Sequence, residues 1–212
     1  MTEVYAFDRG DELLPEELML FLPPWRRERT ERLKHPPARQ ESLAAGLLLG
    51  CVMARWGLSP WEPVATLPAG KPVFAGREDV WFSLSHSGRY ALCAVSTEPV
   101  GADVQLMRPV NLSMARRLHP EERDWLSRQA EEEREDAFFR LWTRKEAWVK
   151  AVSEERMLSL SETDVIHRLP GLTFRDWALP GGYRASVCAR EESIPEIILL
   201  TRDDILNLRV KT

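Results

Sequence analysis

Two short segments of the chain carry polar side chains at spacings suited to holding a metal ion and phosphate. Asp103 and Gln105 lie two residues apart in a predicted strand, so their side chains project from the same face. Glu146 and Lys150 lie four residues apart in a predicted helix and therefore share one of its faces. Carboxylate and amide oxygens are the ligands that Mg2+ prefers, and an ammonium group beside them would attract phosphate. Brought together by the fold, these four residues would form a site that binds a phosphorylated ligand.

Taken alone, each pair has a simpler explanation. An isolated Asp-x-Gln pair usually lies on a solvated sheet edge, because polar side chains are mostly exposed. A glutamate and a lysine four residues apart are usually a surface ion pair, worth about 0.3 kcal/mol. The helix also carries Phe138, Phe139 and Trp148, so it is not expected to be broadly exposed. A carboxylate among such aromatics is partly desolvated, which is typical of functional sites, and the two interpretations of Glu146 stay balanced at this point.

Further polar residues are candidates for phosphate contacts. His86 lies near the tip of a predicted hairpin, where it could bind a phosphate or simply cap the turn. Lys71 lies in a predicted loop, where it could place an ammonium group on a ligand or stay solvated. The basic run over residues 26–39 could be a charged helix face, a phosphate clamp or a nucleic-acid patch. Nucleic acid ranks last, because only Trp25 adds an aromatic ring to this run.

The composition limits the class of protein. The 212 residues are 44% hydrophobic and 29% charged, which is ordinary for a globular chain with one large domain or two small ones. The net charge of -4 argues against general nucleic-acid binding. No secretory signal is expected, and the longest apolar run, residues 43–54, is too short for a membrane span and predicts a buried helix. The three cysteines are widely spaced in apolar contexts and predict reduced core residues, so a cytoplasmic location is expected.

The elements that must position the candidate residues predict an α+β protein. Residue patterns predict helices over 41–56 and 130–152, with a further helix starting at Pro120. Strands are predicted over residues 80–85, 90–95, 100–106, 183–189 and 196–201. Because the first three strands have short connections, they are expected to form one antiparallel sheet. Two small sub-domains would meet near residue 100.

Four motifs, in this order and spacing, resemble a known family. The chain is similar to the 4'-phosphopantetheinyl transferases, and in particular to the larger, two-half type that includes the surfactin-synthetase activator. The resemblance covers about residues 20–190, and the last motif is the most specific. The motifs are Gly70-Lys71-Pro72, Phe82-Ser83-Leu84-Ser85-His86-Ser87-Gly88-Arg89, Val100-Gly101-Ala102-Asp103-Val104-Gln105 and Phe139-Arg140-Leu141-Trp142-Thr143-Arg144-Lys145-Glu146-Ala147-Trp148-Val149-Lys150.

The resemblance implies two similar α/β halves with pseudo-twofold symmetry, each a small antiparallel sheet packed with helices. Residues 1–99 would form the N-terminal half and contact the phosphates of coenzyme A. Residues 100–212 would form the C-terminal half, with the metal and catalytic residues. Coenzyme A would bind in the cleft between them. Since one chain would supply both walls of the cleft, a monomer is expected.

The resemblance also implies a role for each candidate residue. Asp103, Gln105 and Glu146 would ligate a magnesium ion that also contacts the pyrophosphate of coenzyme A. Lys150 would lie on the same phosphates, and Glu146 would accept the proton of the acceptor serine, so that Glu146, Lys150 and Asp103 form the catalytic set. The other expected contacts to coenzyme A are Lys71, Ser85 and His86 on its phosphates, and Arg26, Arg29 and Ser42 at its nucleotide end.

The reaction implied by the resemblance is transfer of the 4'-phosphopantetheine group of coenzyme A to a serine of an apo acyl or peptidyl carrier protein, with release of 3',5'-ADP. Carrier proteins of this kind serve fatty-acid, polyketide or nonribosomal peptide biosynthesis. Neither nucleic acid nor a membrane is an expected partner.

Two departures from the family pattern support an alternative function. The family commonly has glutamate at the position of Gln105, so the charge of the ligand set falls from about -3 to -2 and metal binding should weaken. Residues 153–157 also replace a glycine-rich turn of the family. The alternative is a catalytically weakened relative that binds coenzyme A or a carrier protein without turnover.

Overall fold

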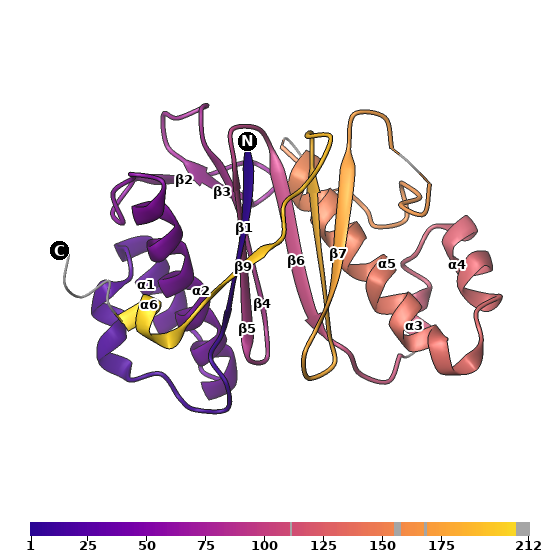
Figure 1. The fold of residues 1–212 in the computed structure, drawn as a ribbon, viewed down its shortest axis with the longest axis horizontal. Helices are drawn as coiled ribbons and strands as arrows, with labels where there is room; N and C mark the ends of the chain where they lie inside the picture. Colours follow the sequence, from indigo (N-terminus) through magenta and orange to yellow (C-terminus); the bar gives the residue numbers. More distant parts are fainter. Residues whose placement is uncertain (111, 155–157, 168, 207–212) are drawn as a thin grey trace.

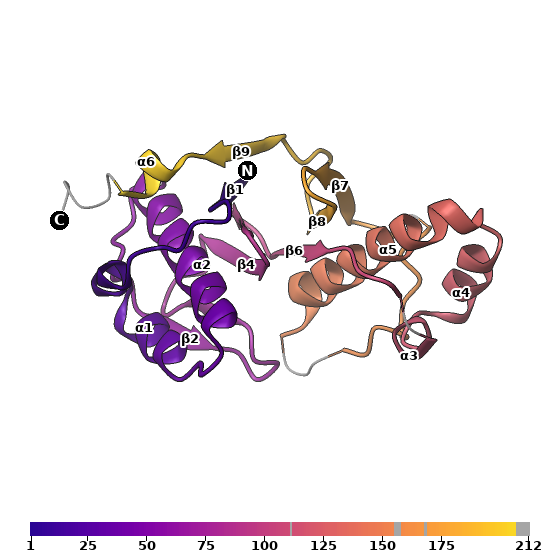
Figure 2. The same cartoon turned by 90° about the horizontal axis from the view of Figure 1, so that it is seen from below.

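The computed structural model describes residues 1–110, 112–154, 158–167 and 169–206. Its layers run from helices through two sheets to helices again, with the sheets in the middle of the molecule (Figures 1 and 2). Helix–sheet packing of this kind buries one face of each element against the next. The mixture of helices and small antiparallel sheets confirms the α+β class predicted from the sequence.

The first sheet has the strand order β4-β5-β1-β9. Neighbouring strands are antiparallel, except that β9 runs parallel to β1. The strands are β1 (Thr2–Asp8), β4 (Trp81–Ser87), β5 (Tyr90–Ser96) and β9 (Ile197–Leu200).

The second sheet has the order β6-β8-β7 and is antiparallel throughout. Its strands are β6 (Val100–Leu106), β7 (Thr173–Leu179) and β8 (Tyr183–Ala189). A separate two-stranded ribbon joins β2 (Val64–Thr66) to β3 (Pro72–Phe74).

The helices of the described ranges cover the outer faces of the two sheets (Figure 1). The longest are α2 (Pro36–Arg55) and α5 (Glu131–Val152). None of these helices is both long and apolar enough to cross a membrane. The shorter ones are a 3-10 helix (Glu16–Phe21), α1 (Pro24–Glu31), α3 (Leu112–Ala115), α4 (Pro120–Ser127) and α6 (Arg202–Leu206).

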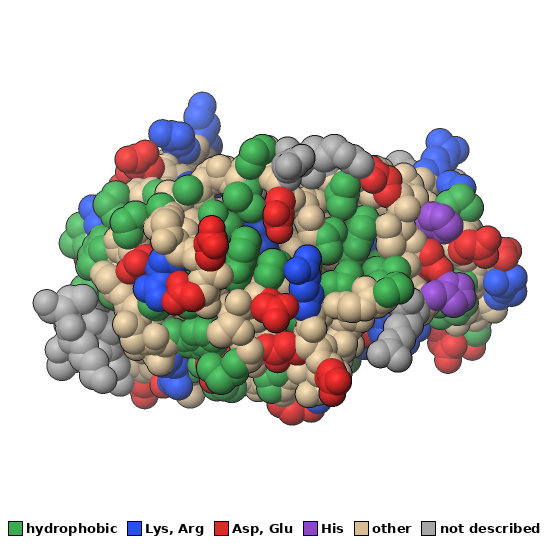
Figure 3. Space-filling view, turned by 90° about the horizontal axis from the view of Figure 1, so that it is seen from above, with side chains coloured by type: hydrophobic (Ala, Val, Ile, Leu, Met, Phe, Trp, Pro, Cys, Tyr) green, Lys and Arg blue, Asp and Glu red, His purple; other side chains and the backbone are tan. Residues whose placement is uncertain are grey.

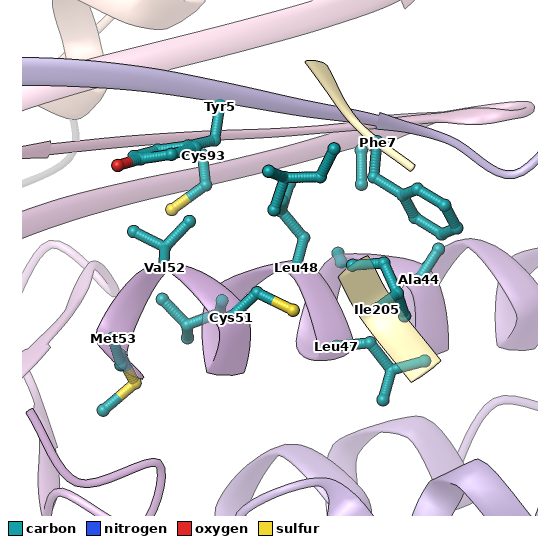
Figure 4. Packing of buried hydrophobic residues seen from close by; sticks show 14 of the residues in the cluster. Tyr5, Phe7, Ala44, Leu47, Leu48, Cys51, Val52, Met53, Cys93 and Ile205 are labelled. Carbon is teal, nitrogen blue, oxygen red and sulfur yellow. The ribbon is translucent and has the colours of Figure 1, made fainter. Parts of the chain in front are cut away.

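Helix α2 is buried on most of its surface, as its apolar sequence predicts. Figure 4 shows Tyr5 and Phe7 of β1 pointing toward Leu48 and Val52 of the helix, with Cys93 of β5 beside them. All three cysteines of the chain are buried and free, in agreement with the prediction of reduced core residues. Helix α2 thus supplies a large part of the core on the outer face of the first sheet.

Helix α5 approaches the second sheet unusually closely at Gly101. A Cβ atom added to Gly101 would lie 1.8 Å from the carbonyl oxygen of Ala147 and 2.6 Å from the backbone nitrogen of Ala151. Helix and strand therefore touch backbone to backbone, and only glycine fits at this point. This contact fixes how far the side chains of α5 lie from those of β6.

A third core lies between the two sheets. Its members are small and branched residues of both inner faces, together with the ring pair of Tyr90 and Tyr183, whose centroids are 4.8 Å apart. Arg175 and Trp177 of β7 bind Glu196, just before β9, and so tie the second sheet to the segment that leads back to the first. The two sheets therefore form a face-to-face pair.

Strands β4 and β6 lie at adjoining sheet edges and are joined by serine side chains. Ser83, Ser85 and Ser87 alternate along β4, so their hydroxyls face the same way. We call these three residues the serine ladder. Their hydroxyl oxygens accept hydrogen bonds from the backbone N–H groups of Ala102 at 2.9 Å, Val104 at 3.3 Å and Leu106 at 3.0 Å.

Two lysines bind carbonyl groups along the same edge of β6. Lys71 donates to the carbonyl of Val100 at 2.9 Å, and Lys150 donates to the carbonyl of Ala102 at 3.0 Å. A sheet edge normally needs another strand or solvent to satisfy these groups. Here, side chains do so.

The serine ladder overturns one prediction from the sequence. The strands over residues 80–85, 90–95 and 100–106 were expected to form one antiparallel sheet, but the third, β6, belongs to a separate sheet. The physical reason is that the hydroxyls of β4, and not its backbone, bind the N–H groups of β6.

The division into halves at residues 1–99 and 100–212 stays a prediction, as does their pseudo-twofold relation. The structure adds that the last strand, β9, returns to the N-terminal sheet and pairs with β1 from Val4 to Phe7. The C-terminal part of the chain therefore completes the sheet with which the chain begins.

Replacing Ser83 by alanine should lower the free energy of unfolding by about 1–3 kcal/mol, because the buried N–H of Ala102 would lose its acceptor. Chemical denaturation of the two proteins measures the change. Ser127→Ala is the matched control, since its hydroxyl is exposed and bonds only to the carbonyl of Asp124 among the described residues. Equal effects of the two substitutions would contradict the structural role of the ladder.

Candidate active site

All but one of the predicted site residues gather in one cavity of about 780 Å³ where the two sheets adjoin. Its walls come from α1, the turn between β2 and β3, β4, β6 and α5. The predicted residues that line it are Arg26, Arg29, Lys71, Ser85, His86, Asp103, Gln105, Glu146 and Lys150.

Ser42 lies behind the cavity wall and does not line it. It is buried, and its hydroxyl is 2.8 Å from that of Thr30. Its carbonyl accepts a hydrogen bond from Arg26 at 3.1 Å. Ser42 therefore supports Arg26 from behind and has no surface on the cavity.

Asp103 is the centre of the hydrogen-bond network of the cavity. Its Oδ1 accepts from the Ser85 hydroxyl and from Lys150 Nζ, each at 2.7 Å, and its Oδ2 accepts from Gln105 Nε2 at 3.1 Å. The side chain is only 3% exposed. The polar pairs of strand and helix thus meet around one buried carboxylate.

Glu146 lies in the same cavity, and its surroundings disfavour its charged form. Burial raises its pKa above the usual range, and the negative charge of Asp103 raises it further. Lys150 and Arg117 act in the opposite direction with smaller effect. Two neighbouring carboxylates in a partly buried site favour either a proton or a cation between them.

The rest of the lining is basic. Arg26, Arg29, Lys71, Arg108 and Lys150 contribute five cations, against the two carboxylates of Asp103 and Glu146. The excess is local, because acidic and basic side chains are interspersed on the face shown in Figure 3. A cavity with this balance favours a polyanionic ligand.

Arg26 and Lys71 are cations held partly out of water. Burial lowers the pKa of Arg26 to about 10, and its Nε has no hydrogen-bond partner among the described residues. Burial likewise lowers the pKa of Lys71 to about 8. Buried polar groups normally have partners, so the unpaired N–H of Arg26 is suited to a ligand.

Comparison with known proteins adds an independent observation. The sequence model of the 4'-phosphopantetheinyl transferase superfamily matches residues 99–191. The 4'-phosphopantetheinyl transferase Sfp of Bacillus subtilis strain 168 is 28% identical over 208 residues, which cover 90% of this chain and 92% of the relative. These matches support the assignment of the chain to the 4'-phosphopantetheinyl transferase superfamily.

Two other members of the superfamily show the same relationship. The transferase psf-1 of Bacillus pumilus is 29% identical over 209 residues, covering 91% of this chain and 89% of the relative. A putative 4'-phosphopantetheinyl transferase of Synechocystis, slr0495, is 37% identical over 134 residues, covering 59% and 54% of the two chains. The predicted family, its larger surfactin-synthetase-activator type and the enzyme class are thereby confirmed.

The sequence did not single out several cavity residues of this phosphopantetheinyl transferase. Arg108 lines the cavity two residues beyond the end of β6. Its positive charge just after that strand was the feature of the sequence that could have indicated it. Trp25, Phe139 and Trp142 supply apolar wall. Their aromatic character was visible, but nothing local distinguished a cavity wall from a closed core.

The sequence also did not predict the buried ion pair of Lys145 and Glu122. Both side chains are fully buried, with 2.7 Å between Lys145 Nζ and Glu122 Oε2. Glu122 also accepts from the backbone N–H groups of His119 and Val165, and Lys145 donates to the carbonyl of Thr163. This pair ties α5 to α4 and to the segment after α5.

The depressed pKa of Lys71 predicts pH-dependent anion binding. In the free protein the ammonium is charged below about pH 8 and neutral above it, so affinity for pyrophosphate should fall as the pH rises from about 7 to 9. Titration calorimetry with inorganic pyrophosphate measures this fall. Lys71→Met should bind more weakly at pH 7 and show a shallower fall, whereas Lys34→Met should match the wild type. An unchanged pH profile in Lys71→Met would contradict the assignment.

Proposed function

We propose that this protein transfers the 4'-phosphopantetheine group of coenzyme A to a serine of an apo acyl or peptidyl carrier protein. The observation that carries the proposal is the cavity that joins Lys71, Ser85, Asp103 and Glu146 from four separate segments of the chain. The basic lining of the cavity suits the phosphates of coenzyme A. The relatives of the protein bear the name of this activity. The products would be the holo carrier protein and 3',5'-ADP.

The donor set fits a magnesium ion, although with fewer charges than the family pattern. Among the described residues, no group of three or more His, Cys, Asp or Glu side chains is placed to hold a metal. The proposed ligands are therefore two carboxylates, Asp103 and Glu146, and the amide oxygen of Gln105. Because Gln105 Nε2 donates to Asp103, its Oε1 is the atom left for a cation. When bound, magnesium would neutralise charge on the pyrophosphate.

Lys150 is suited to hold the pyrophosphate in the cavity. Among the described residues, two of its three N–H groups bind the carbonyl of Ala102 and Oδ1 of Asp103, so one is left to donate to a phosphate oxygen. Lys71, Arg26 and Arg29 are proposed to bind the remaining phosphate oxygens of coenzyme A. Ordering of these cations before the ligand arrives reduces the cost of positioning it.

Glu146 is the proposed base for the acceptor serine. Its raised pKa makes it a better proton acceptor than an exposed glutamate. The serine Oγ forms a bond to the phosphorus on the pantetheine side, and the bond from that phosphorus to the oxygen leading to 3',5'-ADP breaks. The hydroxyl proton moves to a carboxylate oxygen of Glu146, directly or through one water. No covalent enzyme intermediate is required.

One observation favours the alternative of binding without turnover. Gln105 donates a hydrogen bond to Asp103 Oδ2, and both oxygens of that carboxylate already have partners. A cation must compete with these partners for Asp103. A weakened relative that binds coenzyme A or a carrier protein is therefore the second candidate.

We further propose that the protein acts as a monomer in the cytoplasm. Both walls of the cavity come from the same chain, which supports a site complete within one molecule. Nucleic acid and membranes are not proposed as partners.

Incubation with coenzyme A, Mg2+ and an apo carrier protein should add the mass of one phosphopantetheine group to the carrier. Glu146→Gln should lower the rate at least about 100-fold, because it removes the proposed base. Asp103→Ala should lower it by a similar factor, because it removes the acceptor of the hydrogen bonds from Ser85, Gln105 and Lys150. The matched control is Glu133→Gln, on an exposed turn of the same helix. If several carriers gain no mass although coenzyme A binds measurably, the proposed transfer is refuted and the alternative, binding without turnover, is favoured. Wild-type rates in either variant would refute the site.

Gln105→Glu should strengthen Mg2+ binding by about 3–10-fold, since affinity in such sites rises with the number of charged ligands. Calorimetric titration with Mg2+ measures the affinity independently of turnover. Glu62→Gln serves as a control for altered charge outside the cavity. An unchanged or weaker affinity in Gln105→Glu would show that residue 105 is no metal ligand.

A further inference from the structure

An acidic residue lies beside the basic cavity and contacts one of its lining residues. Glu41, on α2, places its Oε2 3.2 Å from Nδ1 of His86 on β4. Both side chains are partly exposed, at 22% for Glu41 and 31% for His86. Neither the sequence motifs nor the proposed mechanism accounts for Glu41.

On charge alone, Glu41 should weaken the binding of a polyanion. Like charges repel, and a carboxylate next to the phosphate-binding wall opposes the cations around it. The pKa of Glu41 is lowered, first by its hydrogen bond with His86, so the group is ionised at neutral pH. A benefit must therefore come through its contact with His86.

The contact determines how the imidazole ring is oriented. An ionised carboxylate can only accept, so Nδ1 of His86 carries the hydrogen. The ring plane is thereby fixed, and Nε2 is the nitrogen left for a ligand. The backbone N–H of Gly88, at the turn after β4, also lowers the pKa of Glu41 and so favours its charged form.

We propose that Glu41 is a positioning residue that holds the imidazole of His86 for a phosphate group of coenzyme A. The ligand in this inference rests on the proposed function, but the Glu41–His86 contact does not. When a phosphate oxygen reaches Nε2, this nitrogen takes up a proton from solvent, so that the imidazolium donates one N–H to the phosphate and the other to Glu41. The cation then lies between two anions, an arrangement with strong charge-assisted hydrogen bonds.

Other charged groups around this pair do not replace Glu41. Arg26 and Arg29 face the cavity from α1, and Asp103 faces it from β6. Arg9 acts electrostatically on Glu41. Among the described residues, no hydrogen bond joins any of these four to His86, whose ring bonds to Glu41.

The sign of the effect on affinity tests the proposal. Calorimetry with coenzyme A should give an affinity about tenfold weaker in Glu41→Met, which removes the acceptor, and about threefold weaker in Glu41→Gln, which keeps an acceptor without charge. If Glu41 acts only as a nearby negative charge, both variants should bind more tightly than the wild type. Glu28→Gln, which removes an exposed charge on α1, is the matched control and should change affinity less than twofold.

A double-mutant cycle separates positioning from a general structural effect. In a His86→Ala background, Glu41→Met should no longer weaken binding, because there is no ring to hold. The same loss in both backgrounds would overturn the proposal, as would tighter binding by Glu41→Gln and Glu41→Met.

Steady-state kinetics adds a second readout. Glu41→Gln should raise KM for coenzyme A while kcat at saturation stays within about twofold of the wild type. A fall in kcat alone would also contradict a positioning role in binding. If the protein binds coenzyme A with the expected coupling but transfers nothing, the proposed function fails and this inference stands. If the wild type binds no coenzyme A, both fail.

Discussion

The join between β4 and β6 is the constraint on which the rest of the structure depends. Two sheets adjoin without sharing a backbone ladder, so the N–H groups at the edge of β6 need other acceptors. The serine ladder supplies them at 2.9–3.3 Å. A hydroxyl can donate once and accept twice, and Ser85 uses this capacity by accepting from Val104 while donating to Asp103. The same atom therefore holds the sheets together and orients the central carboxylate of the cavity.

Two separate contacts direct the polar residues of helix α5 at the cavity. One sets the distance of the helix from β6, and the other sets its rotation about its own axis. The backbone contact at Gly101 sets the distance to β6. The buried pair of Lys145 and Glu122 sets the rotation of the helix. Turning the helix would break the pair and leave both charges buried without a partner, which is energetically costly. Burial lowers the pKa of Lys145, which marks the desolvation that the pair must offset. Glu146 and Lys150 share another face of this helix and are thereby directed at the cavity that contains Asp103.

Local periodicity explains which parts of this arrangement could be predicted from the sequence. The shared faces of Asp103 with Gln105 and of Glu146 with Lys150 follow from strand and helix geometry, and the burial of α2 follows from its apolar residues. The serine ladder could not be predicted, because alternating serines look the same whether they face water or the N–H groups of another strand. The position of Ser42 behind the wall, and the partnership of Lys145 with Glu122, likewise depend on tertiary packing.

The pairing of β9 with β1 has a consequence for how this chain folds during synthesis. Val4 pairs with Ile197, so one edge of β1 is without its neighbour until synthesis has passed residue 200. Contacts between residues so far apart in sequence form late and slow the folding of a sheet. During that interval, β1 presents an unprotected strand edge, and such edges pair readily with other chains. Pairing with β9 thus covers the exposed edge of β1, and until it forms, aggregation through that edge competes with folding.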